Sequence, residues 1–92
     1  MTNAEKDLYI AIGKVLWEDW DPIGVNEFPE ANDEYNGYIP SIFRLAVENA
    51  DQQTIALKLN EFVQVNMGLF GDMVHCLEVA DKIISVRDSY KN

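Results

Sequence analysis

Cysteine and long apolar runs are nearly absent from this sequence. Cys76 is the only cysteine among 92 residues, and a single thiol can form neither an intramolecular disulfide nor a closed zinc site. No apolar stretch approaches the roughly 18 residues that a membrane span requires. Residues 1–7 have neither the basic start nor the apolar run of a secretory signal. We therefore expect a cytoplasmic protein in a reducing compartment, with no membrane partner.

Basic residues are scarce as well. The chain has 7 Lys and Arg against 16 Asp and Glu, which gives a net charge of −9 and a pI near 4.3. Binding to phosphate groups requires Lys and Arg that displace counterions, and an acidic protein is repelled by anionic membrane surfaces. The charge balance therefore predicts no nucleic-acid partner.

The overall composition is typical of a globular domain. Hydrophobic residues make up 48% of the chain and charged residues 25%, which is too apolar for a disordered acidic tail. A chain of this length has enough residues for one modest core and too few for two. We expect one domain over residues 1–92.

The apolar residues recur at helical spacing in four segments. Thr2 and Glu5 form a capping box for a first helix that runs to about Glu18, and Gly13 within it indicates a close approach by a neighbouring helix. A second helix is predicted from about residue 37 to about residue 49, with Pro40 in its first turn.

Two further helices are predicted in the second half of the chain. Asp51 caps a third helix that Gly68 closes in the left-handed conformation, and Asp72 opens a fourth whose tail, residues 87–92, we expect to fray. Short connections favour antiparallel neighbours. The sequence predicts an all-α fold, a compact four-helix domain with a long acidic loop between the first and second helices.

That loop is the most unusual part of the chain. Helical periodicity is lost from Asp19 to about Asn36, and Asp21 is expected to be extended because Pro22 follows it. Connections of this length are uncommon in compact domains and tend to be functional or disordered. Five aromatic residues between positions 17 and 38 argue against disorder. We expect an ordered loop that some of its aromatic rings hold in place.

Seven carboxylates and no base occur between Lys14 and Arg44. Charge blocks are more often solvated surface than binding sites, but carboxylates beside aromatic rings can steer a basic protein and then anchor it. Whether each ring is an anchor or part of the core is left open by the sequence. The candidate partner-binding residues are Glu18, Asp19, Trp20, Asp21, Glu27, Phe28, Glu30, Asp33, Glu34, Tyr35 and Tyr38.

Two other motifs are weighed against this interpretation. Residues 19–30 imitate the ligand spacing of a calcium loop, but Ile23 has no side-chain oxygen, and Pro22 and Pro29 stiffen the segment. A turn at Asp21 is the better interpretation. His75 and its neighbour Cys76 point about 100 degrees apart on a helix and lack a catalytic constellation. We predict no enzyme, no metal and no cofactor.

Several short motifs resemble a known family. They are Trp20-Asp21-Pro22, Asp33-Glu34-Tyr35, Tyr38-Ile39 and the stretch from Cys76 to Ile83. Together they resemble the YugE-like family of small bacterial proteins of unknown function, which implies a compact helical domain with a cysteine in its last helix. The run over residues 20–25 followed by Asp-Glu-Tyr also resembles small acidic immunity proteins encoded beside polymorphic bacterial toxins.

The function predicted from the sequence is stoichiometric protein binding without catalysis. The concrete form is an immunity protein that masks the active-site surface of a basic toxin domain. The alternative is a structural or regulatory module that associates with itself or with a housekeeping protein through exposed apolar surface, its acids serving as solubilisers.

Overall fold

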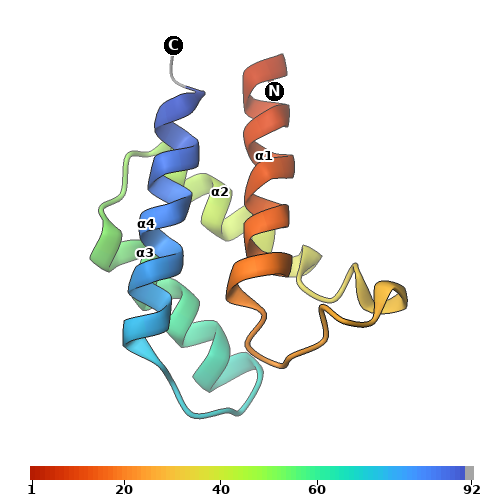
Figure 1. Cartoon of the computed structure of the whole chain (residues 1–92). Helices are drawn as coiled ribbons and strands as arrows, with labels where there is room; N and C mark the ends of the chain where they lie inside the picture. The colour runs from red at the N-terminus through yellow and green to blue at the C-terminus, as the bar shows by residue number, and fades with distance from the viewer. Residues whose placement is uncertain (91–92) are drawn as a thin grey trace.

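Four α-helices build the protein (Figure 1). The computed structural model describes residues 1–90, and it contains no strand within them. The helices are α1 (Asn3–Val15), α2 (Ile39–Val47), α3 (Gln52–Glu61) and α4 (Met73–Ser89). The prediction of an all-α, four-helix domain is confirmed.

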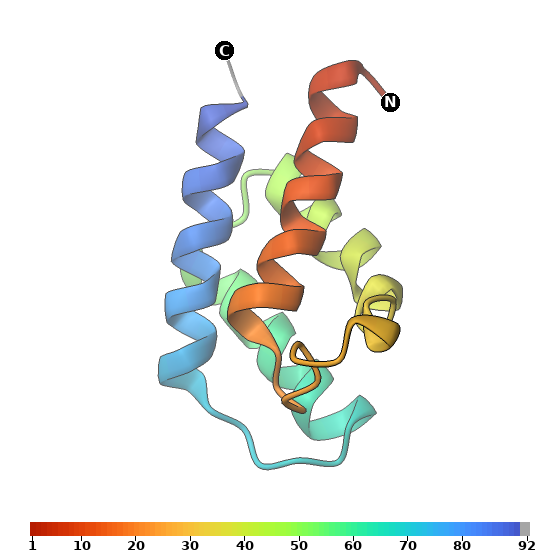
Figure 2. The ribbon, with the colours of Figure 1, turned by 45° about the vertical axis from the view of Figure 1, so that its right-hand side comes forward.

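The longest helices, α1 and α4, lie side by side and run in opposite directions, so the start of α1 and the end of α4 lie at the same end of the molecule (Figures 1 and 2). Helix α4 packs against α3 more extensively than any other pair of elements. Over residues 1–90, no helix is both long enough and apolar enough to cross a membrane.

The helix boundaries that polar caps define are confirmed. Thr2 and Glu5 form the predicted capping box, and the carboxylates of Asp51 and Asp72 accept the amides of Thr54 and His75 at 2.8 and 3.1 Å. These side chains supply acceptors for first-turn amides that have none within the helix.

Two α-helices continue as π-helical turns, and the first of them thereby extends beyond its predicted end. The first covers Leu16–Trp20 and the second Phe62–Asn66. The amide of Asp21 accordingly donates to the carbonyl of Leu16, five residues back, at 3.0 Å. The first helical segment therefore ends at Trp20 and not at about Glu18. Gly68 follows the second turn with φ +66°, as predicted.

The connection over residues 21–38 is not the plain loop that the sequence predicted over Asp19–Asn36. It contains two 3-10 turns, at Pro29–Ala31 and Asn36–Tyr38. Asp21 is left-handed, with φ +31°, and not extended. Its conformation reverses the chain directly after the π-helical turn.

The core lies between the four helices. Ile12, Ile42, Leu59 and Ile83, one from each helix, are fully buried. A Cβ atom placed on Gly13 would lie 2.9 Å from Cδ1 of Ile39, which confirms the predicted close approach to α2. The tail over residues 87–92 was predicted to fray. This is wrong for residues 87–89, which belong to α4, and residues 91 and 92 lie outside the described part of the chain.

Candidate functional site

The four aromatic rings predicted to bind a partner have different surroundings. Trp20 and Tyr35 are only 1% and 2% exposed. They cannot contact a partner in this conformation, so their prediction as surface anchors is wrong. Tyr38 is half-buried, and Phe28 is 52% exposed. Large rings favour burial, and here the core takes two of the four.

Trp20 lies at the centre of an aromatic cluster. Its ring centroid is 5.4 Å from that of Tyr35, 5.7 Å from Tyr38 and 6.4 Å from Phe62. Tilted and edge-to-face pairs at such distances contribute roughly 0.5–1.5 kcal/mol beyond area burial. The cluster therefore fastens both ends of the connection to the π-helical turn after α3, which confirms the expectation that some of its rings hold it in place.

Asp21 has a structural role within the connection. Its carboxylate accepts hydrogen bonds from the amides of Val25 and Asn26, at 2.9 and 3.3 Å, and from the hydroxyl of Tyr35 at 2.6 Å. These bonds stabilise its left-handed backbone, a conformation that costs a non-glycine residue about 1 kcal/mol or more. Asp21 is thus a turn residue, and its acceptors are already in use.

The hydroxyl of Tyr35 makes two hydrogen bonds. It donates to Asp21 and accepts the amide of Ile23 at 3.3 Å. Burial raises the pKa of Tyr35 well above its ordinary value, and the Asp21 carboxylate raises it further because it accepts the hydroxyl proton. The neutral phenol is therefore part of the folded structure.

Asp19 also has a partner within the chain. Its carboxylate lies 2.8 Å from Nζ of Lys82 on α4. The hydrogen bond and the charge of Asp19 raise the pKa of Lys82. This pair connects the end of the first helical segment to α4 and removes Asp19 from the unpaired acids.

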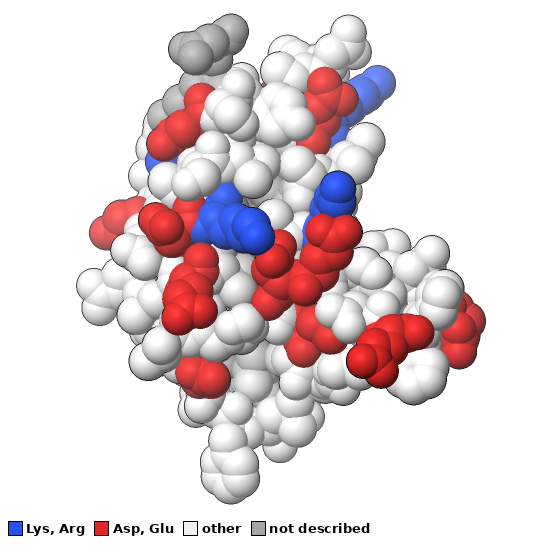
Figure 3. Space-filling view, viewed as in Figure 1, with Lys and Arg blue, Asp and Glu red and all other residues white. Residues whose placement is uncertain are grey.

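The other predicted acids remain available. Glu18, Glu27, Glu30, Asp33 and Glu34 are all exposed, and none takes part in an ion pair among residues 1–90. Figure 3 shows acidic and no basic groups where the connection protrudes, at the right of the molecule. We call these five acids and Phe28 the acidic surface.

Backbone hydrogen bonds give the acidic surface a defined shape. Carbonyls three residues back accept the amides of Phe28, Ala31, Glu34 and other residues of the connection, at 2.9–3.2 Å. The side-chain amide of Asn26 reaches the carbonyl of Glu18 at 3.4 Å. The connection is therefore a series of turns fixed to the first helical segment.

The calcium-loop imitation brings no cluster of ligands together. Across residues 1–90, no group of three His, Cys, Asp or Glu side chains is placed to hold a metal ion. Asp19 and Asp21, the first and third positions of the imitation, are engaged by Lys82 and Tyr35. The interpretation of Asp21 as a turn residue is confirmed.

A hollow of about 520 Å³ beside Trp20 was not predicted from the sequence. His75 lines it, with Nε2 2.9 Å from the carbonyl oxygen of Trp20. Burial raises the pKa of the neighbouring Cys76 thiol; the Trp20 indole N–H opposes that rise without reaching hydrogen-bond geometry. The indole nitrogen has no partner among the described residues, and a buried unpaired donor costs about 1–3 kcal/mol.

Comparison with known proteins adds no relative. No family model, no curated protein and no solved structure matches the chain. The resemblances to the YugE-like family and to immunity proteins therefore stay predictions, and the function is argued from the site alone.

Proposed function

We propose that this chain is a non-enzymatic protein-binding domain, an immunity protein that neutralises a basic toxin in the cytoplasm by covering its positive active-site surface. One observation carries the proposal: four exposed acids on the ordered connection, and Glu18 just before it, form no ion pair among residues 1–90. If these acids only kept the protein soluble, interspersed Lys and Arg would lower their mutual repulsion. None occurs between Lys14 and Arg44.

The acidic surface has the parts that a rapid and specific complex requires. Its negative field increases the rate at which a basic protein arrives in the correct orientation. Phe28, 52% exposed among these acids, supplies apolar area that becomes buried on contact. Because turns already fix the backbone, little conformational entropy is lost on binding.

Replacing acids at two different places tests the proposal. The variant Glu27→Gln, Glu30→Gln, Glu34→Gln removes three charges from the acidic surface. The matched control Glu48→Gln, Glu61→Gln, Asp88→Asn changes the net charge equally at exposed acids that lie beside Arg44, Lys58 and Arg87. Each purified protein is immobilised and exposed to lysate of the native host, and captured proteins are identified by mass spectrometry.

We expect wild type and control to capture the same basic protein, and the acidic-surface variant to lose it. Equal capture by all three proteins would show that the interaction does not depend on the acidic surface. Capture of no basic protein by wild type would also contradict the proposal.

A second function, self-association as a structural or regulatory module, is favoured by a different observation. No charged residue occurs between Glu61 and Asp72, where Val65, Leu69 and Phe70 are 41–99% exposed, and Val74 just beyond this stretch is 69% exposed. Sedimentation velocity of wild type and Phe70→Ser over a range of concentrations separates the two functions. A wild-type dimer that the substitution dissociates would favour self-association.

A further inference from the structure

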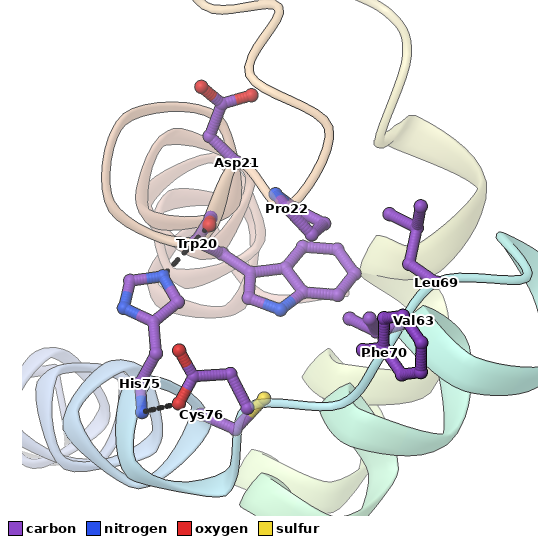
Figure 4. Close-up of a pocket in the computed structure, with 9 residues that line it drawn as sticks. Trp20, Asp21, Pro22, Val63, Leu69, Phe70, His75 and Cys76 are labelled. Carbon is purple, nitrogen blue, oxygen red and sulfur yellow. Dashed lines mark hydrogen bonds between the residues drawn. The ribbon is translucent and has the colours of Figure 1, made fainter.

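The hollow beside Trp20 has the features of a binding site, and it is separate from the acidic surface. It lies between the reversal of the chain at Asp21 and the loop that leads into α4 (Figure 4). Its volume of about 520 Å³ falls in the range of small-molecule sites. Its residues include Trp20, Val63, Leu69, Phe70, His75 and Cys76.

One hydrogen-bond donor in this wall has no partner. Trp20 is only 1% exposed, and its indole nitrogen makes no hydrogen bond of good geometry to a described residue; the Cys76 thiol beside it is a weak acceptor. Figure 4 shows that the nitrogen lies on the edge of the ring that faces the Cys76 side of the hollow. Buried polar groups in proteins are almost always paired, so this donor, which has only a weak sulfur acceptor beside it, is free to take a stronger one.

The rim of the hollow is apolar and unusually exposed. Phe70 is 99% exposed and Leu69 41%, whereas Val63 behind them is buried. A wholly exposed phenylalanine presents apolar area that a ligand can cover. The indole nitrogen is covered, so a ligand reaches it only when the loop that carries Leu69 and Phe70 moves aside.

Charge determines which ligands fit. Asp21 and Asp72 are among the residues that line the hollow, and no Lys or Arg of the described part of the chain lines it. Asp21 accepts the Tyr35 hydroxyl and Asp72 the amide of His75. An anionic ligand would be repelled, and the indole N–H would donate to a neutral oxygen.

We propose that the hollow binds a small, uncharged ring compound that carries a carbonyl oxygen. The oxygen accepts the hydrogen bond of Trp20 Nε1–H, and the ring packs against Leu69 and Phe70. This site does not rest on the proposed function and can be tested without the toxin.

Nuclear magnetic resonance of the indole N–H groups tests the site directly. Three probes of one ring size are titrated into ¹⁵N-labelled protein: benzamide, which is neutral and has a carbonyl; benzoate, which is anionic; and toluene, which has no acceptor. The variant Trp17→Phe assigns the Trp20 signal, because the chain has only two tryptophans.

We expect benzamide to shift the Trp20 indole signal in a saturable manner, and benzoate and toluene to bind roughly 3- to 10-fold more weakly. No saturable shift with benzamide would overturn the proposal and leave the donor to a buried water molecule. Equal or tighter binding of toluene would overturn the hydrogen bond, and equal or tighter binding of benzoate would overturn the preference for neutral ligands.

Substitution of the rim gives a second test. Phe70→Ala should weaken benzamide binding roughly 3- to 10-fold, because it removes apolar area from the site. Ile10→Ala, which truncates a side chain that is 69% exposed on α1, is the control and should leave the dissociation constant unchanged. An unchanged constant for Phe70→Ala would place the ligand elsewhere.

Discussion

At the scale of single residues, Tyr35 joins the acidic connection to the core. Its ring packs beside Trp20 in the core, and its hydroxyl bonds to both Asp21 and the amide of Ile23. One side chain therefore holds the reversal at Asp21 and the segment before α2 together. The shape of the acidic surface depends on it.

Tyr35→Phe should lower the free energy of unfolding by about 1–2 kcal/mol, because it removes two hydrogen bonds, one of them to a carboxylate. Tyr38→Phe is the matched control, since no hydrogen bond of the Tyr38 hydroxyl is found among residues 1–90 and its ring lies in the same cluster. Urea denaturation measures both. Equal losses for the two variants would show that the hydroxyl of Tyr35 contributes nothing.

Two buried groups predict how stability depends on alkaline pH. The pKa values of Tyr35 and Cys76 are raised in the folded protein above the ordinary 10.0 and 9.0. A raised pKa means that each group holds its proton to a higher pH in the folded state than in the unfolded state. The contribution of the neutral group to the free energy of unfolding is therefore complete below the ordinary pKa and is lost as pH rises above it.

The free energy of unfolding should therefore fall from about pH 9 upward, by at most about 1.4 kcal/mol per pH unit for each group. Tyr35→Phe should make this fall shallower above pH 10. Urea denaturation at pH 8–11 measures the slope. If the free energy of unfolding of the variant falls as steeply with pH as that of wild type, ionisation of Tyr35 does not contribute to the fall.

At the scale of elements, Gly68 determines how the segment after α3 ends. Its φ of +66° is left-handed, and the amide of Leu69 donates to the carbonyl of Val63 at 3.0 Å. Glycine adopts this conformation without the steric penalty that a Cβ atom brings. The exposed rim of the hollow follows directly, so this glycine also positions Leu69 and Phe70.

Gly68→Ala should destabilise the protein by about 1 kcal/mol through its backbone alone. Gly37→Ala is the control, because a Cβ atom at either position meets nothing within 4 Å and only Gly68 has a positive φ. Thermal unfolding of both variants makes the comparison. A loss no larger for Gly68→Ala would contradict the role of its left-handed backbone.

The elements that the sequence predicts correctly are those that local chemistry defines. Thr2, Asp51 and Asp72 cap their helices, and Gly68 closes the third helical segment, because each effect involves neighbours within a few residues. The π-helical turns were not predicted, since hydrogen bonds to the fifth residue back leave no distinct local pattern. The 3-10 turns of the connection were missed because each covers only three residues, too few to show a hydrophobic period.

The candidate site was only partly predictable because burial depends on the whole fold. The sequence identified the run of acids without bases. It could not show whether Trp20 and Tyr35 lie in the core or on the surface, because an aromatic residue fits either place. The ion pair of Asp19 with Lys82 joins residues that are distant in sequence. The hollow is likewise formed by residues from three segments that only the fold brings together.

At the scale of the whole molecule, the net charge of −9 is unevenly placed. A helical scaffold carries the acidic surface, whose five acids form no ion pair among residues 1–90, and the hollow is lined by other residues. The first feature is suited to a basic protein and the second to a small neutral ligand. The two functions can therefore be tested separately.

The rate of association with the captured basic protein tests the central claim most directly. Surface plasmon resonance at about 50 mM to about 500 mM NaCl separates association from dissociation. Screening of the acidic surface should lower the association rate at least roughly tenfold and change the dissociation rate little. An association rate that stays the same over this range would contradict a binding surface formed by Glu18, Glu27, Glu30, Asp33 and Glu34.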